Sequence, residues 1–187
     1  MSGRLHCEAT PIPGLMVVHR RPLEDHRGTF ERLFCVQELR SAGHPGIVAQ
    51  ANRSLTRRVG TVRGMHLQMP PHADWKVIAC TRGTVRDVVV DLRAGSPALL
   101  RWHAVTLDGD GHQSLLVPPG CAHGFQVLEG PAEMIYLHSQ PFVPEADGGV
   151  RADDPRLAIS WPLPIAELSD RDAAHPLIET GFQGVPA

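Results

Sequence analysis

The sequence predicts an all-β protein made of antiparallel strands, arranged as a sandwich or a small barrel. Its 187 residues include 17 prolines and 18 glycines, which are spread along the whole length rather than gathered in one linker. Turn signals recur about every ten residues between runs rich in β-branched side chains, without βαβ alternation. This punctuation is typical of many short strands joined by tight turns.

The first part of the chain predicts strands and one short helix. Residues 14–20 read as a strand, and the segment 24–35 (EDHRGTFERLFC) has a turn at Arg27-Gly28 followed by a strand or a short helix. Residues 36–42 (VQELRSA) predict a helix, because they are good helix formers closed by a glycine. From residue 47 onward, two strands are expected around Arg57-Arg58.

Residues 75–93 (WKVIACTRGTVRDVVVDLR) predict a β-hairpin whose turn is at residues 81–83. In the second run, alternation places an apolar stripe on one face and a stripe containing Asp87 and Asp91 on the other. The face with the acids has two interpretations. It lines a polar pocket inside a barrel, or it simply meets solvent.

The remaining strands are expected at residues 100–107, on both sides of the turn at residues 118–120, and again within residues 132–142 (AEMIYLHSQPF). After residue 142 the chain becomes rich in Pro, Gly and Asp, and residues 165–172 (IAELSDRD) predict a last helical turn. The length favours one domain, with a β core at about residues 12–145 and a C-terminal loop and helix segment at about residues 146–187.

Composition argues against several classes of partner. A formal net charge of −2 and a pI near 6.6 do not fit a protein that binds mainly nucleic acid or an anionic membrane. The four cysteines are widely spaced, as expected for reduced thiols. The N-terminal region has no apolar signal-like run, and no stretch is long and apolar enough to span a membrane. We therefore expect a cytoplasmic protein.

Residues 63–76 (RGMHLQMPPHADWK) place an imidazole, His66, near two cations, Arg63 and Lys76. An imidazole exchanges protons near neutrality, and a fixed cation stabilises negative charge that develops on a substrate. This pairing suits proton abstraction next to a carbonyl. Taken alone, the same residues also fit an ordinary hairpin, and Tyr136, the only tyrosine of the chain, also fits simple packing.

A catalytic metal is the main alternative for a barrel with 11 histidines. A metal site in a small barrel typically uses two histidines two residues apart on one strand, with a nearby glutamate and a third histidine. The chain lacks this pattern, because His66 is followed by Gln68 and His123 by Phe125. It also lacks a recognisable activated nucleophile or a Gly-rich phosphate loop. Acid–base chemistry without a metal or other cofactor is therefore favoured.

An ordered set of motifs extends from about residue 12 to residue 176. The set comprises DHRGTF (25–30), QANRS (50–54), RGMHLQMPPH (63–72), Lys76, DVVVDLRAGSP (87–97), VPPGCAHGF (117–125), Tyr136, GVRADDP (149–155), Trp161-Pro162 and LSDRD (168–172). In this order and at this spacing, they resemble the dTDP-4-dehydrorhamnose 3,5-epimerase family of sugar-nucleotide enzymes. The resemblance implies a cupin-type jelly roll that forms a homodimer and needs no metal or cofactor. It also implies inversion at C3 and C5, which flank the C4 ketone of a nucleoside-diphosphate 4-keto-6-deoxy sugar.

The resemblance also implies roles for particular residues. His66 matches the base that removes the proton at C3 or C5, and Asp172 matches the acid paired with it. Lys76 matches the cation near the C4 oxygen, and Tyr136 matches the acid that returns a proton from the opposite face. The residues implied in substrate binding, with Asp87 completing a polar interior, are Arg27, Phe30, Gln50, Asn52, Arg63, His123 and Phe142.

The chain departs from the family pattern at Arg32, Leu67 and Trp75, which the resemblance implies are positions near the substrate. These departures leave the matched His, Lys, Tyr and Asp intact. The resemblance therefore indicates the type of reaction more firmly than it indicates the substrate. An epimerase acting at C3 alone, or on another nucleotide sugar, and a non-catalytic binding barrel remain alternatives.

Overall fold

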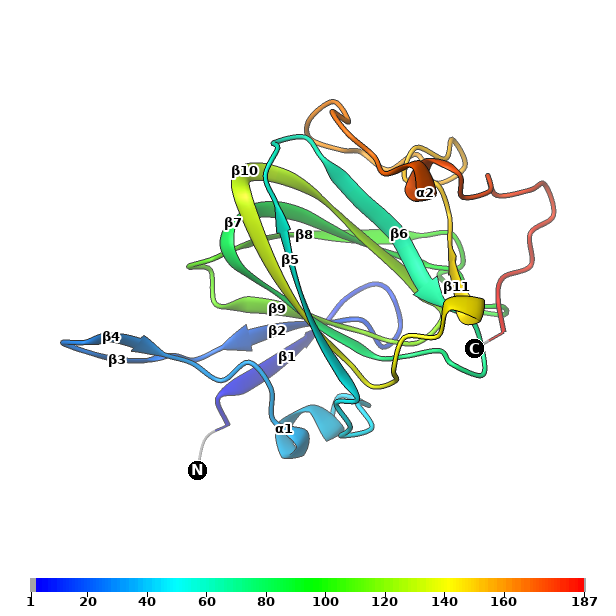
Figure 1. Cartoon of the computed structure of the whole chain (residues 1–187). Helices are drawn as coiled ribbons and strands as arrows, with labels where there is room; N and C mark the ends of the chain where they lie inside the picture. The colour runs from blue at the N-terminus through cyan, green and yellow to red at the C-terminus, as the bar shows by residue number, and fades with distance from the viewer. Residues whose placement is uncertain (1–2, 187) are drawn as a thin grey trace.

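The computed structural model describes residues 3–186 and confirms the all-β prediction. Nine strands form one antiparallel sheet (Figure 1). In chain order they are β1 (Leu5–Ala9), β2 (Met16–Arg20), β5 (Gln50–Thr56), β6 (Val62–Gln68), β7 (Lys76–Asp91), β8 (Trp102–Asp108), β9 (Gln113–Val117), β10 (Cys121–His138) and β11 (Asp147–Gly149). Two further strands, β3 (Leu23–Asp25) and β4 (Gly28–Phe30), pair only with each other.

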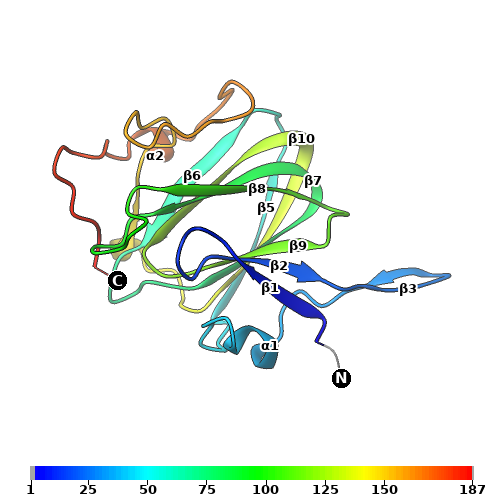
Figure 2. The ribbon, with the colours of Figure 1, turned by 180° about the vertical axis from the view of Figure 1, so that it is seen from behind.

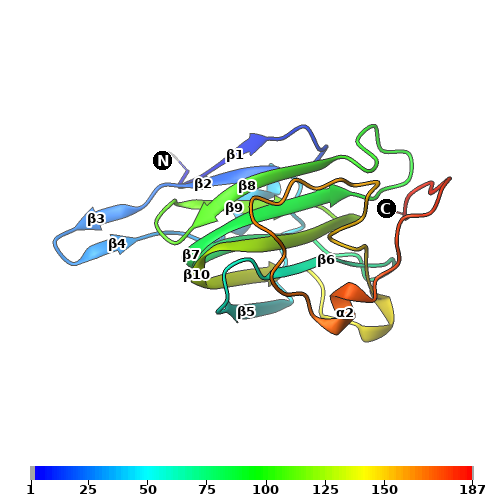
Figure 3. The same ribbon diagram turned by 90° about the horizontal axis from the view of Figure 1, so that it is seen from above.

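Strands β7 and β10 are long, and they pair with each other along nearly their whole length. Their two halves belong to different layers. The first half of β7 pairs with β9, and the second half of β10 pairs with β5, in a layer that also contains β1 and β2. The other halves pair with β8 and β6, and β6 continues to β11. The sheet therefore folds into two layers that share β7 and β10, as Figures 1 and 3 show.

The predicted hairpin at residues 75–93 is wrong, because β7 runs through residues 81–83 without reversing. Gly83 has a positive φ of 73°, and β7 and β10 shift register in this region. These irregularities bend the strand instead of ending it, since β10 pairs with β7 on both sides of the bend. Turn-forming residues here mark the crossing from one layer to the other.

The same correction applies to β10, where separate strands were expected before and after Glu129-Gly130. The strand is continuous from Cys121 to His138. Other expectations are confirmed: β5 and β6 flank Arg57-Arg58, β2 lies within its predicted segment, and β8 ends one residue beyond its predicted segment. The early helix α1 (Val36–Arg40) is present, though shorter than expected. The C-terminal region contains the 3₁₀ helix η1 (Pro144–Ala146) and the short helix α2 (Asp170–Ala173).

Two apolar clusters lie on opposite faces of β7. Val85 and Val89 belong to the cluster inside the barrel, with Phe125 and Leu115. The stripe of Val88, Val90 and Leu92 packs outside the barrel against residues of the C-terminal segment, which Figure 2 shows along one edge of the barrel. The face of β7 that carries acids is therefore the interior one, where Asp87 is fully buried. Of the two interpretations of this face, the polar pocket is correct.

The β3–β4 hairpin extends away from the barrel (Figures 1 and 3). Every residue of its two strands is exposed, and Phe30 retains 71% of its accessible surface. An exposed aromatic side chain on a projecting two-stranded ribbon is typical of a surface that meets another molecule. Among the described residues, no helix is long and apolar enough to cross a membrane.

Truncating the interior of the barrel should destabilise the fold strongly. Leu115 on β9 is fully buried in the interior cluster, so we expect Leu115→Ala to lower the free energy of unfolding by about 2–5 kcal/mol. Leu23→Ala on the exposed hairpin removes the same atoms, and it should change stability by no more than about 0.5 kcal/mol. Urea denaturation followed by circular dichroism measures both. Equal losses would contradict this assignment of the core.

Candidate active site

A cleft between the two layers is formed by adjoining pockets of about 190 and 280 Å³. Both pockets are lined by Asn52, His66, Lys76 and His138. These side chains come from β5, β6, β7 and β10, and so from both layers of the barrel. The fold thus brings together residues that are up to 86 positions apart in sequence, including a pair at 3.4 Å, Asn52 Nδ2 and His138 Nε2.

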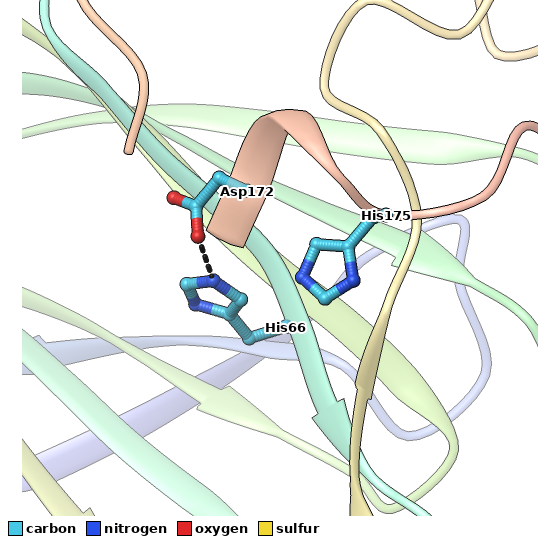
Figure 4. Close-up of side chains that lie close together, drawn as sticks. All are labelled: His66, Asp172 and His175. Atoms are coloured by element: carbon cyan, nitrogen blue, oxygen red, sulfur yellow. Dashed lines mark hydrogen bonds and ion pairs between the residues drawn. The ribbon is translucent and has the colours of Figure 1, made fainter. Parts of the chain in front are cut away.

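His66 on β6 is hydrogen-bonded to Asp172 on α2, with 2.8 Å between Nε2 and Oδ1 (Figure 4). The other carboxylate oxygen accepts a hydrogen bond from the backbone N–H of Gly64 at 3.0 Å. Burial alone would raise the pKa of Asp172, but these hydrogen bonds outweigh it and lower the pKa to about 2. The carboxylate is therefore ionised at neutral pH. It fixes the imidazole ring through Nε2 and leaves Nδ1 as the free nitrogen.

Helix α2 holds Asp172 in place through its own first turn. Ser169 is the N-cap, and its hydroxyl accepts a hydrogen bond from the Asp172 backbone N–H at 3.1 Å. This capping explains why the LSDRD segment, although 106 residues beyond His66 in sequence, presents its last acid to β6.

Lys76 begins β7, and its ammonium group lies 3.0 Å from Asp74 Oδ1. The second oxygen of Asp74 is 2.8 Å from Nδ1 of His138 on β10. The Asp74 side chain is 1% exposed and that of Lys76 is 10% exposed, so this is a buried ion pair. Burial raises the pKa of Asp74, but the hydrogen bond to His138 and the charge of Lys76 outweigh it and lower the pKa. A charged lysine is therefore held at the wall of the cleft.

Tyr136 lies two residues before His138 on the same face of β10, and their rings stack at 6.2 Å between centroids. Its hydroxyl is 3.1 Å from the hydroxyl of Ser54 on β5. Burial raises the pKa of the Tyr136 hydroxyl well above its ordinary value. The phenol therefore keeps its proton at neutral pH and faces the cleft as a neutral donor.

His123 and Asp87 form a second histidine–carboxylate pair inside the barrel. His123 Nε2 lies 2.9 Å from each carboxylate oxygen of Asp87. Burial of Asp87 raises the pKa of its carboxyl, and the neighbouring His123 only partly opposes this. The His123 ring is 6.2 Å from the ring of Tyr136. This pair therefore places polar groups next to Tyr136 in the interior of the barrel.

Four other predicted residues also line the cleft. Gln50 accepts a hydrogen bond from the Phe142 backbone N–H at 2.8 Å, and its own amide donates to Asn52 at 3.1 Å. Arg63 donates through Nε to the hydroxyl of Thr56 at 2.8 Å. Phe142 is 48% exposed at the rim. These residues provide donors, acceptors and an apolar surface around His66 and Lys76.

Arg27 and Phe30 are the exceptions, because they lie on the projecting β3–β4 hairpin. Arg27 pairs with Asp25 of the same hairpin at 2.6 Å. The pocket at this hairpin is lined only by hairpin residues, and neither Arg27 nor Phe30 lines the cleft that contains His66. Within a single chain, Arg27 and Phe30 therefore lie apart from the residues that line the cleft.

Sequence reasoning missed Asp74, His138 and Arg171 at the cleft. The signal for His138 was present, since alternation along a strand places residues 136 and 138 on one face. Arg171 reaches the cleft because it pairs with Asp147 of β11 at 2.5 Å, and no spacing predicts that contact. One further histidine, His175, lies close to the hydrogen-bonded pair of His66 and Asp172, here called the dyad. Together with His66 and Asp172, it is the one group of possible metal ligands found among residues 3–186 (Figure 4).

Side chains that can take up and release protons thus share one cleft of an antiparallel barrel with a fixed cation. This arrangement defines the class of barrel enzymes that work by acid–base chemistry. The sequence model described as dTDP-4-dehydrorhamnose 3,5-epimerase matches residues 9–180. The chain belongs to this family of isomerases, and its fold is the family's cupin-like jelly roll.

Individual relatives are similar to this chain over most of their length. The dTDP-4-dehydrorhamnose 3,5-epimerase of Streptomyces griseus is 41% identical over 88% of this chain and 82% of its own. A 3,5-epimerase structure from Legionella pneumophila, in complex with dTDP-4-keto-L-rhamnose, has a TM-score of 0.87 at 33% identity, covering 92% of both chains. The 3'-monoepimerase ChmJ from Streptomyces bikiniensis, in complex with dTDP-quinovose, has a TM-score of 0.83 at 35% identity, covering 90% of this chain and 85% of that one.

The buried pair of Asp74 and Lys76 predicts a pH-dependent loss of stability in Asp74→Asn. Removing the charge of Asp74 leaves the buried Lys76 ammonium without its counter-ion. The free energy of unfolding at pH 7 should therefore fall by about 3 kcal/mol. The folded pKa of Asp74 is lowered, so its stabilisation is complete above the ordinary value of about 3.9. It disappears as the pH falls through the lowered folded value.

Urea denaturation of both proteins from pH 7 to pH 2.5 measures this difference. Asp153→Asn, in the exposed pair with Arg151, is the matched control and should change stability little at any pH. A difference between wild type and Asp74→Asn that grows on acidification would contradict the assignment.

Proposed function

We propose that this protein inverts C3 and C5 of a dTDP-linked 4-keto-6-deoxy sugar by removing and returning protons through an enolate. The observation that carries the proposal is the His66–Asp172 dyad, which shares a cleft with Lys76 and Tyr136 in a member of the 3,5-epimerase family. The two positions that flank a C4 ketone are the acidic C–H bonds of such a sugar, so one base and one cation serve both.

His66 is the base in this mechanism. Its Nε2–H donates to the Asp172 carboxylate, so the lone pair on Nδ1 is free to accept the proton from carbon. The electron pair of the broken C–H bond moves into the C–C bond, and negative charge develops on the C4 oxygen. Asp172, which is ionised at neutral pH, stabilises the imidazolium that forms.

Lys76 is the cation that stabilises the enolate oxygen. Asp74 and His138 fix its position, and its side chain is mostly withdrawn from water, where a charge acts more strongly than on an exposed surface. Tyr136 is the acid: its hydroxyl proton moves to the carbon from the face opposite His66, the C4 ketone re-forms, and a C–H bond of inverted configuration results. Its raised pKa keeps that proton available at neutral pH. The Tyr136 phenolate then regains a proton from solvent, and the His66 imidazolium loses its proton to solvent, before the next inversion.

Gln50, Asn52, Arg63, His123 and Phe142 are proposed to bind the nucleotide sugar around these groups. Their positions along the cleft support this role. Epimerisation at C3 alone is the second candidate, because the 3'-monoepimerase ChmJ is 35% identical to this chain, close to the 33% of the Legionella 3,5-epimerase. Identity does not separate the two reactions.

Deuterium incorporation tests the reaction and the base together. Incubation of dTDP-, UDP-, GDP- and CDP-linked 4-keto-6-deoxy sugars in deuterated water, followed by NMR, should give label at both C3 and C5 with the dTDP sugar. Label at C3 alone would support the second candidate. His66→Ala should lower turnover by about 10²–10⁴-fold, because it removes the general base.

Retained turnover in His66→Ala would contradict the assignment of the base. Failure of the wild type to turn over any of the four sugars would favour a non-catalytic binding barrel.

We further propose that the protein acts as a homodimer in the cytoplasm and that each chain completes the site of its partner. Arg27 and Phe30 match substrate-binding positions of the family, yet they lie on the projecting hairpin, apart from their own cleft. A second copy is the simplest recipient for them, since symmetric dimers exchange equivalent elements. The four cysteines are free thiols, which fits a reducing compartment.

Mixing two defective variants tests this shared site. His66→Ala keeps the hairpin, and the double variant Arg27→Ala/Phe30→Ala keeps the base, so a mixed dimer contains one intact site. After co-refolding at equal amounts, about one quarter of wild-type activity should return, since half of the dimers are mixed and half of their sites are complete.

Mixing His66→Ala with Lys76→Met is the matched control. Both defects lie within the same cleft, so it should restore nothing. No recovery in the first mixture, or a monomer in light scattering, would refute the shared site.

A further inference from the structure

His175 lies just beyond α2, beside the dyad, and the proposed reaction gives it no role. Its ring packs edge-on against that of His66, with 5.7 Å between centroids (Figure 4). Its Nε2 atom is buried and has no hydrogen-bond partner within residues 3–186. An unsatisfied buried nitrogen costs free energy, so it calls for an explanation.

Figure 4 shows the ring of His175 facing the hydrogen bond between His66 and Asp172. One ligand atom from each of the three residues lies within 4.8 Å of the other two. Two imidazoles and one carboxylate are a donor set that suits Zn²⁺, Co²⁺ and related divalent ions. The sequence did not reveal this group, because 106 residues separate His66 on β6 from Asp172 on α2.

We propose that His66, Asp172 and His175 form a site for a divalent transition-metal ion, of which Zn²⁺ is the best fit, and that the bound ion inhibits the enzyme. The inhibitory part of this inference rests on the proposed function, in which His66 is the base. The binding part does not.

The inhibition follows from the two nitrogens of His66. In the metal-free dyad, Nε2 carries the proton and Nδ1 keeps the lone pair. A metal ion on the side of Asp172 takes the lone pair of Nε2, so the ring proton moves to Nδ1. The imidazole stays neutral, but its free nitrogen now carries a proton and cannot accept one from carbon. The ion therefore suppresses turnover without occupying the substrate's place.

The surroundings leave room for the ion. Tetrahedral Zn²⁺ bound to N and O at about 2.0–2.1 Å needs ligand atoms about 3.3 Å apart. The 2.8 Å contact of His66 with Asp172 must open slightly, and His175 must move closer. Gly149 makes this possible, because a Cβ there would lie 2.6 Å from His175 Nε2. His175 and Gly149 also line a hollow of about 530 Å³, so the His175 side chain is not enclosed on every side.

Metal binding can be measured without any substrate. Isothermal titration calorimetry with Zn²⁺ and visible absorption spectroscopy with Co²⁺ should each give a stoichiometry of one ion per wild-type chain. His175→Ala should weaken Zn²⁺ binding at least tenfold, because even the loss of a group that only supports a metal ligand weakens metal affinity by about that factor. His175→Gln, which keeps more of the side-chain volume, should weaken it as well. Circular dichroism confirms that each variant is folded.

His19→Ala is the matched control, because His19 is a surface histidine that also contacts a carboxylate, Glu8, at 2.8 Å. It should bind Zn²⁺ like the wild type. Unchanged affinity in both His175 variants, or loss of binding in His19→Ala, would overturn the site.

Activity provides the second readout. Zn²⁺ should lower the kcat for deuterium incorporation in wild type and His19→Ala with little change in KM, and EDTA should restore it. His175→Ala should be active and resist the same Zn²⁺ concentration. Inhibition of His175→Ala equal to that of wild type would refute the inference. If metal-free wild type turns over no sugar, the proposed function fails, while the binding measurements still decide the metal site.

Discussion

The continuous pairing of β7 with β10 is the constraint on which the rest of the structure depends. Each strand bends from one layer to the other, so the ladder between them joins both walls of the barrel. Lys76 begins β7 and His138 ends β10, and they are direct partners in the register. The cation and its supporting histidine are therefore placed by backbone hydrogen bonds, and the Asp74 carboxylate completes the arrangement.

Electrostatics gives the interior its chemical character. Three carboxylates, Asp74, Asp87 and Asp172, each contact a different histidine. A buried charge is costly unless it is paired, and each of these pairs also fixes the orientation of a ring. The pairs differ in consequence: hydrogen bonds lower the pKa of Asp74 and Asp172, whereas full burial raises that of Asp87. Barrel walls of similar composition thus hold carboxyl groups of different acidity.

Much of this architecture could be predicted from the sequence, because β-branched runs and turn residues carry local information. The strands flanking Arg57-Arg58 were predicted, and alternation correctly placed Asp87 on the face of β7 opposite Val88 and Val90. Alternation did not decide whether that face is interior, and the tertiary structure shows that it is. The bends at residues 81–83 and 129–131 could not be predicted, since Gly and Pro mark turns and bends alike, and only pairing with a distant strand distinguishes them. For the same reason, the contacts of Asp74 and His175 depend on tertiary structure. The departures at Arg32 and Trp75 also acquire roles only there: Arg32 pairs with Glu38 of α1, and Trp75 packs beside α1.

The β3–β4 hairpin is tied to its own chain by few interactions, since all six residues of its strands are exposed. Substitutions on it should therefore cost the barrel little stability, whereas changes to the cleft disturb buried pairs. A scaffold divided in this way allows its hairpin to change while the buried pairs stay intact, in a family with solved structures in complex with dTDP-4-keto-L-rhamnose and with dTDP-quinovose.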